Sequence, residues 1–166
     1  MTRRTTLAAI LALTVLGGCA PRSGPGTGPE PVYLHMGPLE LSATLEQDGV
    51  DVMGSVDIMN TSRQLVLVEY DGGCELAVLV TGGSSPLWDQ TIWWREHPGV
   101  CPTTTSTRLE IPGRTLARIL TPAVTTLQIA GDSIPLGSFP AAVRLRLMSP
   151  RDTLLVLPTG PVRLDG

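Results

Sequence analysis

Glycine and proline recur along the whole of this 166-residue chain and limit the length of any helix that it can form. There are 18 glycines and 15 prolines, and after residue 30 the longest stretch without either runs from Ser55 to Asp71. Proline inside a helix removes a hydrogen bond and clashes with the preceding turn, and glycine weakens a helix through its conformational entropy. The sequence therefore excludes coiled coils, helical bundles and solenoids of long helices.

From Tyr33 onward, apolar residues alternate with polar or small ones over short segments, the pattern of strands with one buried face. The alternation is clearest over residues 39–45 and 143–147, and Asp48-Gly49 is a strong hairpin signal. No segment has the helical period. The spacing predicts an all-β antiparallel sandwich or barrel of short strands. Further expected strands are 64–70, 74–81, 87–92, 108–111 and 115–120, with a weak one at 126–130.

Composition excludes two further classes of protein. A hydrophobic fraction of 42% with 16% charged residues argues against a disordered chain. The formal net charge of −3 offers no basic face, so we expect no nucleic-acid partner.

Acidic residues concentrate in residues 30–96 and arginines in residues 97–166. In a sandwich these halves interleave, so we expect much of the imbalance to cancel across strands, unless two segregated faces form an interaction surface.

The N-terminus has the pattern of an export signal. Arg3-Arg4 forms a short positive region, and the apolar run 7–16 is too short to span a bilayer. The string Leu16-Gly17-Gly18-Cys19 resembles the lipobox of bacterial lipoproteins, which implies cleavage before Cys19 and a diacylglycerol on its thiol. An ordinary secretory signal with an incidental cysteine and export by the twin-arginine route are the open alternatives.

This organisation divides the chain into three parts. Residues 1–18 are the predicted lipoprotein signal peptide, residues 19–31 hold the lipid-anchor Cys19 and a Gly/Pro-rich linker, and residues 32–166 form one folded domain. Several acyl chains make a stable anchor, so the membrane is an expected partner. Ala20 stands where an Asp would signal inner-membrane retention, so in a host with two membranes we expect the outer membrane.

Two cysteines remain once Cys19 carries lipid. Outside the cytoplasm an isolated pair is expected to be oxidised, so we predict one disulfide between Cys74 and Cys101. Free thiols, a metal site and a catalytic thiol with His97 as base are the alternatives. Metal-ligand spacing is poor, because there is no CxxC and only His35 and His97 accompany the cysteines. We therefore expect no metal and no cofactor.

Four strings along the chain form a recognisable pattern. They are a strand that ends in Asn60-Thr61-Ser62, a Gly82-Gly83 turn before Leu87-Trp88, the string from Leu109 to Pro112-Gly113, and a Gly-aromatic step at Phe139. This pattern resembles the domain named after the Bacillus intracellular proteinase inhibitor (BsuPI-like) and covers about residues 39–148. The resemblance implies an immunoglobulin-like β-sandwich, and no inhibitory motif can be carried over residue by residue.

Three tryptophans stand out among few aromatic residues. We expect Trp88 to pack on the core, as in immunoglobulin domains. Trp93 and Trp94 are adjacent, so on a strand they would face opposite ways and one would lie toward solvent. Together with Arg95 and His97 they form the candidate partner-binding site. The alternative is a loop folded over its own tryptophan.

The sequence offers little support for catalysis. The residue types of a catalytic triad are present at Ser84, His97 and Asp89, but the sequence has no nucleophile elbow. We therefore assign no catalytic residue and expect no enzyme. We predict a lipid-anchored immunoglobulin-like module that binds or assembles a protein or polymer in the bacterial envelope. The alternative is an inhibitor of an envelope or secreted proteinase, acting through an exposed loop near residues 92–107 that a disulfide would stiffen.

Overall fold

The structure is a computed structural model that describes residues 32–82, 85–97, 106–131 and 134–165.

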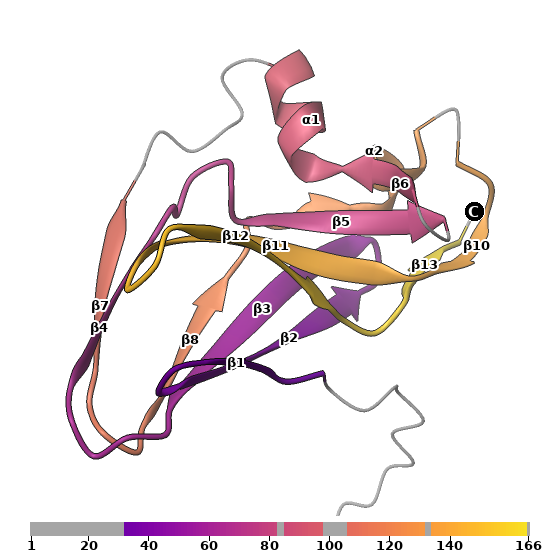
Figure 1. Ribbon diagram of the computed structural model, residues 1–166. Coiled ribbons are helices and arrows are strands. Elements are labelled where there is room, and N and C mark those ends of the chain that lie inside the picture. Colours follow the sequence, from indigo (N-terminus) through magenta and orange to yellow (C-terminus); the bar gives the residue numbers. More distant parts are fainter. Residues whose placement is uncertain (1–31, 83–84, 98–105, 132–133, 166) are drawn as a thin grey trace, which may run out of the picture.

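The first of two stacked sheets is built on a long hairpin. The sheet runs in the order β1-β2-β3-β8 (Figure 1). The short strand β9 pairs with the first residues of β3. Its members are β1 (Leu34–Met36), β2 (Leu39–Asp48), β3 (Asp51–Asn60), β8 (Leu116–Leu120) and β9 (Val124–Thr125).

The second sheet is centred on β11 (Ala141–Ser149) and runs in the order β6-β5-β11-β4-β7, with β12 along the other edge of β11. Both β5 and β4 pair with one edge of β11, and the sheet therefore forks, as Figure 1 shows. The other strands of this sheet are β4 (Val66–Tyr70), β5 (Ala77–Gly82), β6 (Ser85–Asp89), β7 (Thr107–Ile111) and β12 (Thr153–Pro158). A separate two-stranded ribbon is formed by β10 (Gly137–Phe139) and β13 (Val162–Leu164).

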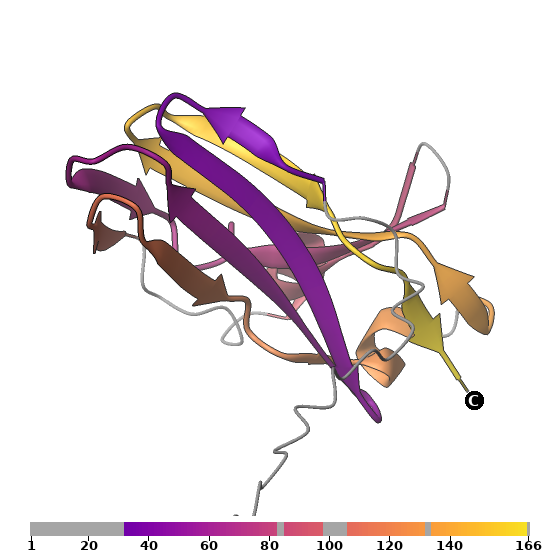
Figure 2. The same cartoon turned by 90° about the horizontal axis from the view of Figure 1, so that it is seen from below.

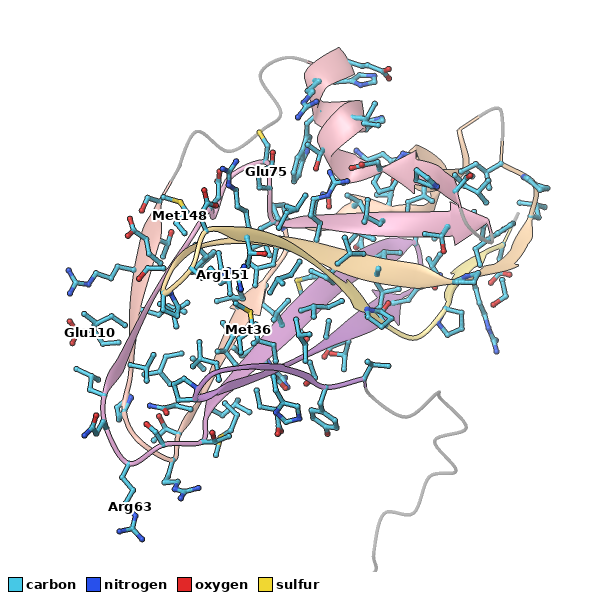
Figure 3. The ribbon with its side chains drawn as sticks, viewed as in Figure 1. Met36, Arg63, Glu75, Glu110, Met148 and Arg151 are labelled. Carbon is cyan, nitrogen blue, oxygen red and sulfur yellow. The ribbon has the colours of Figure 1, made fainter. Side chains whose placement is uncertain are left out.

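The strands bury the residues that the alternation selects. Leu39 and Leu41 on β2 face the central strand, where Val143, Leu145 and Leu147 are fully buried. Met36 packs against this cluster from β1, and Figure 3 shows its side chain between the two sheets. A smaller cluster near the ribbon contains Val80, Val162 and Leu164, with Trp88 packed against it. The predicted all-β antiparallel sandwich and the packing of Trp88 on the core are confirmed.

Two short helices correct the expectation that helical segments are absent. The strand expected over residues 87–92 ends at Asp89, and α1 (Gln90–Glu96) follows. The Asp89 carboxylate accepts the Thr91 N–H and so caps the helix. The weak strand expected over residues 126–130 is α2 (Thr126–Ala130), which begins with a reciprocal capping box between Thr125 and Gln128. Both helices are too short for a periodic pattern to reveal them.

The turns follow their sequence signals closely. Gly49 has a φ of 59° in the β2–β3 hairpin, a conformation that glycine adopts without strain. At the end of β3, the fully buried Asn60 side-chain amide donates to the carbonyl oxygens of Gln64 at 2.7 Å and Ile111 at 2.9 Å. Its carbonyl oxygen accepts the N–H and hydroxyl of Ser62. Asn60 therefore binds the β3–β4 and β7–β8 connections together.

Several sequence predictions concern residues outside the described ranges. The signal peptide, Cys19 and the linker fall within residues 1–31, and Cys101 falls within residues 98–105. The pairing of Cys74 with Cys101 therefore stays a prediction. Within the described ranges, neither helix has the length and apolar character needed to cross a bilayer.

Candidate functional site: the groove between β6 and α1

A solvent-open groove lies where the chain passes from β6 into α1. Its volume is about 220 Å³, and most of its wall is apolar, with two carboxylate side chains. The lining residues are Pro86, Leu87, Trp88, Asp89, Ile92, Trp93 and Glu96. Leu87 is 43% exposed and Ile92 is 49% exposed, so two large aliphatic side chains meet water here.

The helix that forms one wall of the groove is held against the second sheet. Val78 and Val80 face the interior of the sandwich, so Ala77 and Leu79 face outward; both are nevertheless buried. Figure 1 shows α1 lying over β5 at this outer face, and Trp94 on α1 is buried. The wall therefore rests on packed side chains.

An ion pair between the buried Asp89 and the half-buried Arg144 fixes the first turn of α1. The Asp89 carboxylate accepts hydrogen bonds from Arg144 Nη2 at 2.7 Å and Nη1 at 3.2 Å. Arg144 Nη1 also donates to the Thr91 hydroxyl at 3.0 Å, and that hydroxyl donates to the Cys74 carbonyl oxygen. Charge-assisted bonds of this kind are stronger than neutral ones and directional. The network ties the helix start to β11 and to the chain before β5.

Gln90 adds a second attachment beneath the helix. Its side chain is fully buried, accepts the Val78 N–H at 2.8 Å and donates to the Pro122 carbonyl oxygen at 3.2 Å. Each buried polar atom of this amide thus has a partner, which is the condition for burying it without a large penalty. Gln90 links β5 to the segment between β8 and β9.

The four residues predicted as a partner-binding site separate on the helix. Trp94 is buried, so it is part of the packing between α1 and the sheet. Trp93 lines the groove and stacks on His97, with ring centroids 4.3 Å apart, and His97 Nδ1 lies 2.8 Å from the Trp93 carbonyl oxygen. Arg95 is exposed on another side of the helix, 4.0 Å from Glu75, which Figure 3 labels. Trp93 and Trp94 lie on a helix that Asp89 caps, and they differ in burial although they are not on a strand.

The sequence analysis did not identify Pro86 and Leu87 as site residues, and it placed Ile92 only at the start of an exposed loop. The available signal was Asp89, an N-cap residue type three positions before the apolar run from Ile92 to Trp94. Recognising that cap would have placed Ile92 and Trp93 on one helix beside β6. The helix also occupies the start of the loop predicted near residues 92–107, whereas residues 98–105 lie outside the described ranges.

The triad considered from the sequence is not assembled at the described positions. Asp89 caps the first turn of α1 and binds Arg144, and the His97 ring lies against the Trp93 carbonyl oxygen at the other end of the helix. Ser84 lies outside the described residues. Among the side chains that the structure describes, no three His, Cys, Asp or Glu residues gather closely enough to hold a metal ion. His35 lies at the surface, 3.6 Å from Glu40.

Ion pairs join the acidic and the basic halves of the chain. Besides Asp89 and Arg144, the Asp57 carboxylate on β3 accepts two hydrogen bonds from Arg118 on β8, at 2.6 and 2.8 Å. The hydrogen bond from Arg118 holds the pKa of Asp57 below its usual value. Part of the imbalance between the halves therefore cancels across neighbouring strands.

Comparisons with known proteins give no family. No family model matches the chain, and no curated protein matches it. Two solved structures similar to it are of a β-glucosidase from Listeria innocua, in complex with glucose (10% identity, TM-score 0.31) and with gluconolactone (12% identity, TM-score 0.26). In both cases 74% of this chain aligns with 16% of the other. A third is a Northeast Structural Genomics Consortium target, at 10% identity and a TM-score of 0.23, over 82% of this chain and 83% of that one.

The chain thus spans about a sixth of the length of the β-glucosidase chains. TM-scores this low do not establish a shared fold. The resemblance to the BsuPI-like domain stays a prediction.

Proposed function

We propose that this chain is a lipid-anchored, non-enzymatic binding module of the bacterial envelope, which holds a partner protein in the groove between β6 and α1. The membrane attachment rests on the sequence from Leu16 to Cys19 and on the Gly/Pro-rich residues that follow it. The sandwich of residues 32–165 would then be carried at the membrane surface.

The observation that carries the binding role is the exposed apolar groove on a fixed base. Leu87 and Ile92 are each more than two-fifths exposed, although the helix beneath them is attached through Asp89 and Gln90. A groove that keeps its shape without a ligand loses little conformational entropy on binding. Trp93 on its wall is the residue type that most often contributes large binding energies at protein interfaces.

Charge narrows the chemistry of the partner. Glu96 and Asp89 line the groove, no arginine does, and Asp89 is already paired with Arg144. The unpaired carboxylate at Glu96 favours a polypeptide that inserts an aliphatic or aromatic side chain next to a Lys or Arg. Among the described residues, no ion pair involves the Glu96 carboxylate.

Crosslinking in living cells tests this proposal. A photoreactive amino acid at Leu87 should crosslink to one envelope protein, whereas the same group at Leu116, which is more exposed on β8, should not. Ile92→Glu should abolish the Leu87 crosslink because it places a carboxylate in the apolar wall, and Leu120→Glu on β8 should leave it intact. Equal crosslinking from both positions, or a Leu87 crosslink that survives Ile92→Glu, would contradict the role of the groove.

The anchor is tested separately. Cells fed a labelled fatty acid should incorporate it into the chain, and Cys19→Ser should remove the label and release the protein from the membrane fraction. Retention of label in Cys19→Ser would show that the lipid is carried elsewhere. Turnover of a substrate by the purified chain would overturn the non-enzymatic role.

A further inference from the structure

The edge strands of the two sheets differ in how they are protected. Among the described residues, the edge strands of five residues or more are β6, β7, β8 and β12. Exposed edges are ordinarily blocked by charges or proline, because their free N–H and C=O groups invite pairing with another strand. Pro86 interrupts β6, Arg108 and Glu110 lie on β7, and Arg118 lies on β8.

The remaining edge strand, β12, has no such protection along most of its length. Its sequence is Thr-Leu-Leu-Val-Leu-Pro, without a charge and with its proline only at the last position, Pro158. Leu154 is 52% exposed and Val156 is 55% exposed on its outer face. Figures 1 and 2 show β12 at the rim of the second sheet, on the side where β1 forms the rim of the first. An uncharged, aliphatic edge of this length is a ready template for another strand.

The direction of each backbone group on β12 follows from two hydrogen bonds. The Thr159 N–H donates to the Ala141 carbonyl oxygen at 2.9 Å, which fixes the odd-numbered residues of β12 as those that bond to β11. The Thr81 N–H donates to the Pro140 carbonyl oxygen, so the even-numbered residues of β11 face β5, in agreement. The N–H and C=O groups of Leu154 and Val156 therefore point to the open edge.

We propose that β12 pairs with β12 of a second copy of this chain, antiparallel and with Leu155 on the two-fold axis. In this register Leu154 lies opposite Val156 of the second copy, and the two residues exchange both backbone hydrogen bonds, as do their symmetry mates. Directly opposed side chains in such a pair are close enough to contact. The exposed Leu154 and Val156 of both copies then form one aliphatic row, and the second sheets of the two molecules become continuous.

Charge supports a second copy as the occupant. The segment from Thr153 to Pro158 has no ionisable side chain, so two identical edges approach without like-charge repulsion. The nearest arginines on β11 are already paired, Arg144 with Asp89 and Arg146 with Asp152. A two-fold axis through Leu155 also makes the contact self-complementary, as closed homodimers require. The inference does not depend on the groove or on the lipid anchor.

Sedimentation velocity of the full-length chain in mild detergent, over a range of protein concentrations, tests the proposal. The wild-type chain should sediment as a monomer–dimer equilibrium. Val156→Lys should weaken dimerisation by at least about tenfold, because it places a charge on each side of the axis. Leu116→Lys, which changes an equally exposed residue on β8, should dimerise as the wild type does.

Val156→Pro provides a second variant that separates pairing from folding. The Val156 N–H points away from β11, so proline should leave the fold intact while it removes a hydrogen bond from each half of the dimer. Unchanged circular dichroism with loss of dimer is the expected result for both Val156 variants. A wild-type chain that stays monomeric at every concentration overturns the proposal, as does a dimer that survives Val156→Lys. A dimer lost only in Ile92→Glu would assign self-association to the groove instead.

Discussion

Asp89 and Arg144 form a two-pronged ion pair beneath the first turn of α1, although β5 separates the strands that carry them. The same carboxylate caps the helix through the Thr91 N–H. One side chain thus ends β6, starts α1 and holds the helix on the sheet. The shape of the groove depends on this ion pair, because Leu87 comes shortly before Asp89 in the chain and Ile92 shortly after it.

Removing the cation should leave the Asp89 carboxylate buried without its charged partner. Arg144→Met, which keeps most of the aliphatic stem, should lower the free energy of unfolding by about 3 kcal/mol. Urea unfolding followed by circular dichroism measures the change. Arg146→Met is the matched control, because Arg146 and Asp152 are both well exposed and its removal should move the midpoint little. Equal shifts in the two variants would mean that the Asp89 pair is not the stronger attachment.

Gly54 on β3 leaves no room for a side chain. A Cβ atom there would lie 2.5 Å from a methyl carbon of Val143 on the opposite sheet. Gly54→Ala should therefore destabilise the sandwich by about 1–3 kcal/mol through overpacking. Gly160→Ala meets no atom within 4 Å and should cost less than about 0.5 kcal/mol. Thermal unfolding of both variants gives the comparison, and a neutral Gly54→Ala would show that the sheets can separate without cost.

Asn60→Asp keeps the shape of the side chain and removes its N–H donors. A carboxyl group would then face the carbonyl oxygens of Gln64 and Ile111 and should cost about 2–3 kcal/mol. Burial should raise the pKa of the new carboxyl in the folded state, so the penalty should grow as pH rises above about 4, the unfolded value. Urea unfolding at pH 4 and pH 7 measures this trend.

The control for that substitution is Gln47→Glu, the same chemical change at an exposed site. Gln47 donates to the Arg163 carbonyl oxygen from the surface, where water can replace the bond. Little loss of stability and no marked pH dependence are expected. A similar pH trend in both variants would show that the effect of Asn60→Asp does not come from burial.

The pair of Asp57 and Arg118 should make stability depend on pH in the acid range. Because the pKa of Asp57 is lowered in the folded state, its contribution is present above the unfolded pKa and is lost as pH falls through the folded pKa. Arg118→Gln should raise the pKa of Asp57 toward its ordinary value in a carboxyl-carbon NMR titration. Arg95→Gln, which removes a different exposed arginine, should leave that titration unchanged.

The strands and turns were largely predictable because they depend on local patterns. The alternation over residues 39–45 and 143–147 identified buried faces, and the turns at Asp48-Gly49 and Asn60 follow from side-chain and glycine chemistry. The helices were missed because a segment of five or seven residues is shorter than two helical turns and shows no period. Their caps were the remaining signal, at Asp89 and at Thr125 with Gln128.

The amino-acid sequence by itself determined an all-β chain, its main strands and the residues that face the core, since strand period and turn chemistry act between near neighbours. Only the tertiary structure decided that Arg144 lies under α1, that Trp94 is buried while Trp93 lines a groove, and that β12 is left at a sheet edge. Each of these depends on which distant strands pair. Strand pairing is decided by the packing of the whole sandwich, because many registers satisfy the same local pattern.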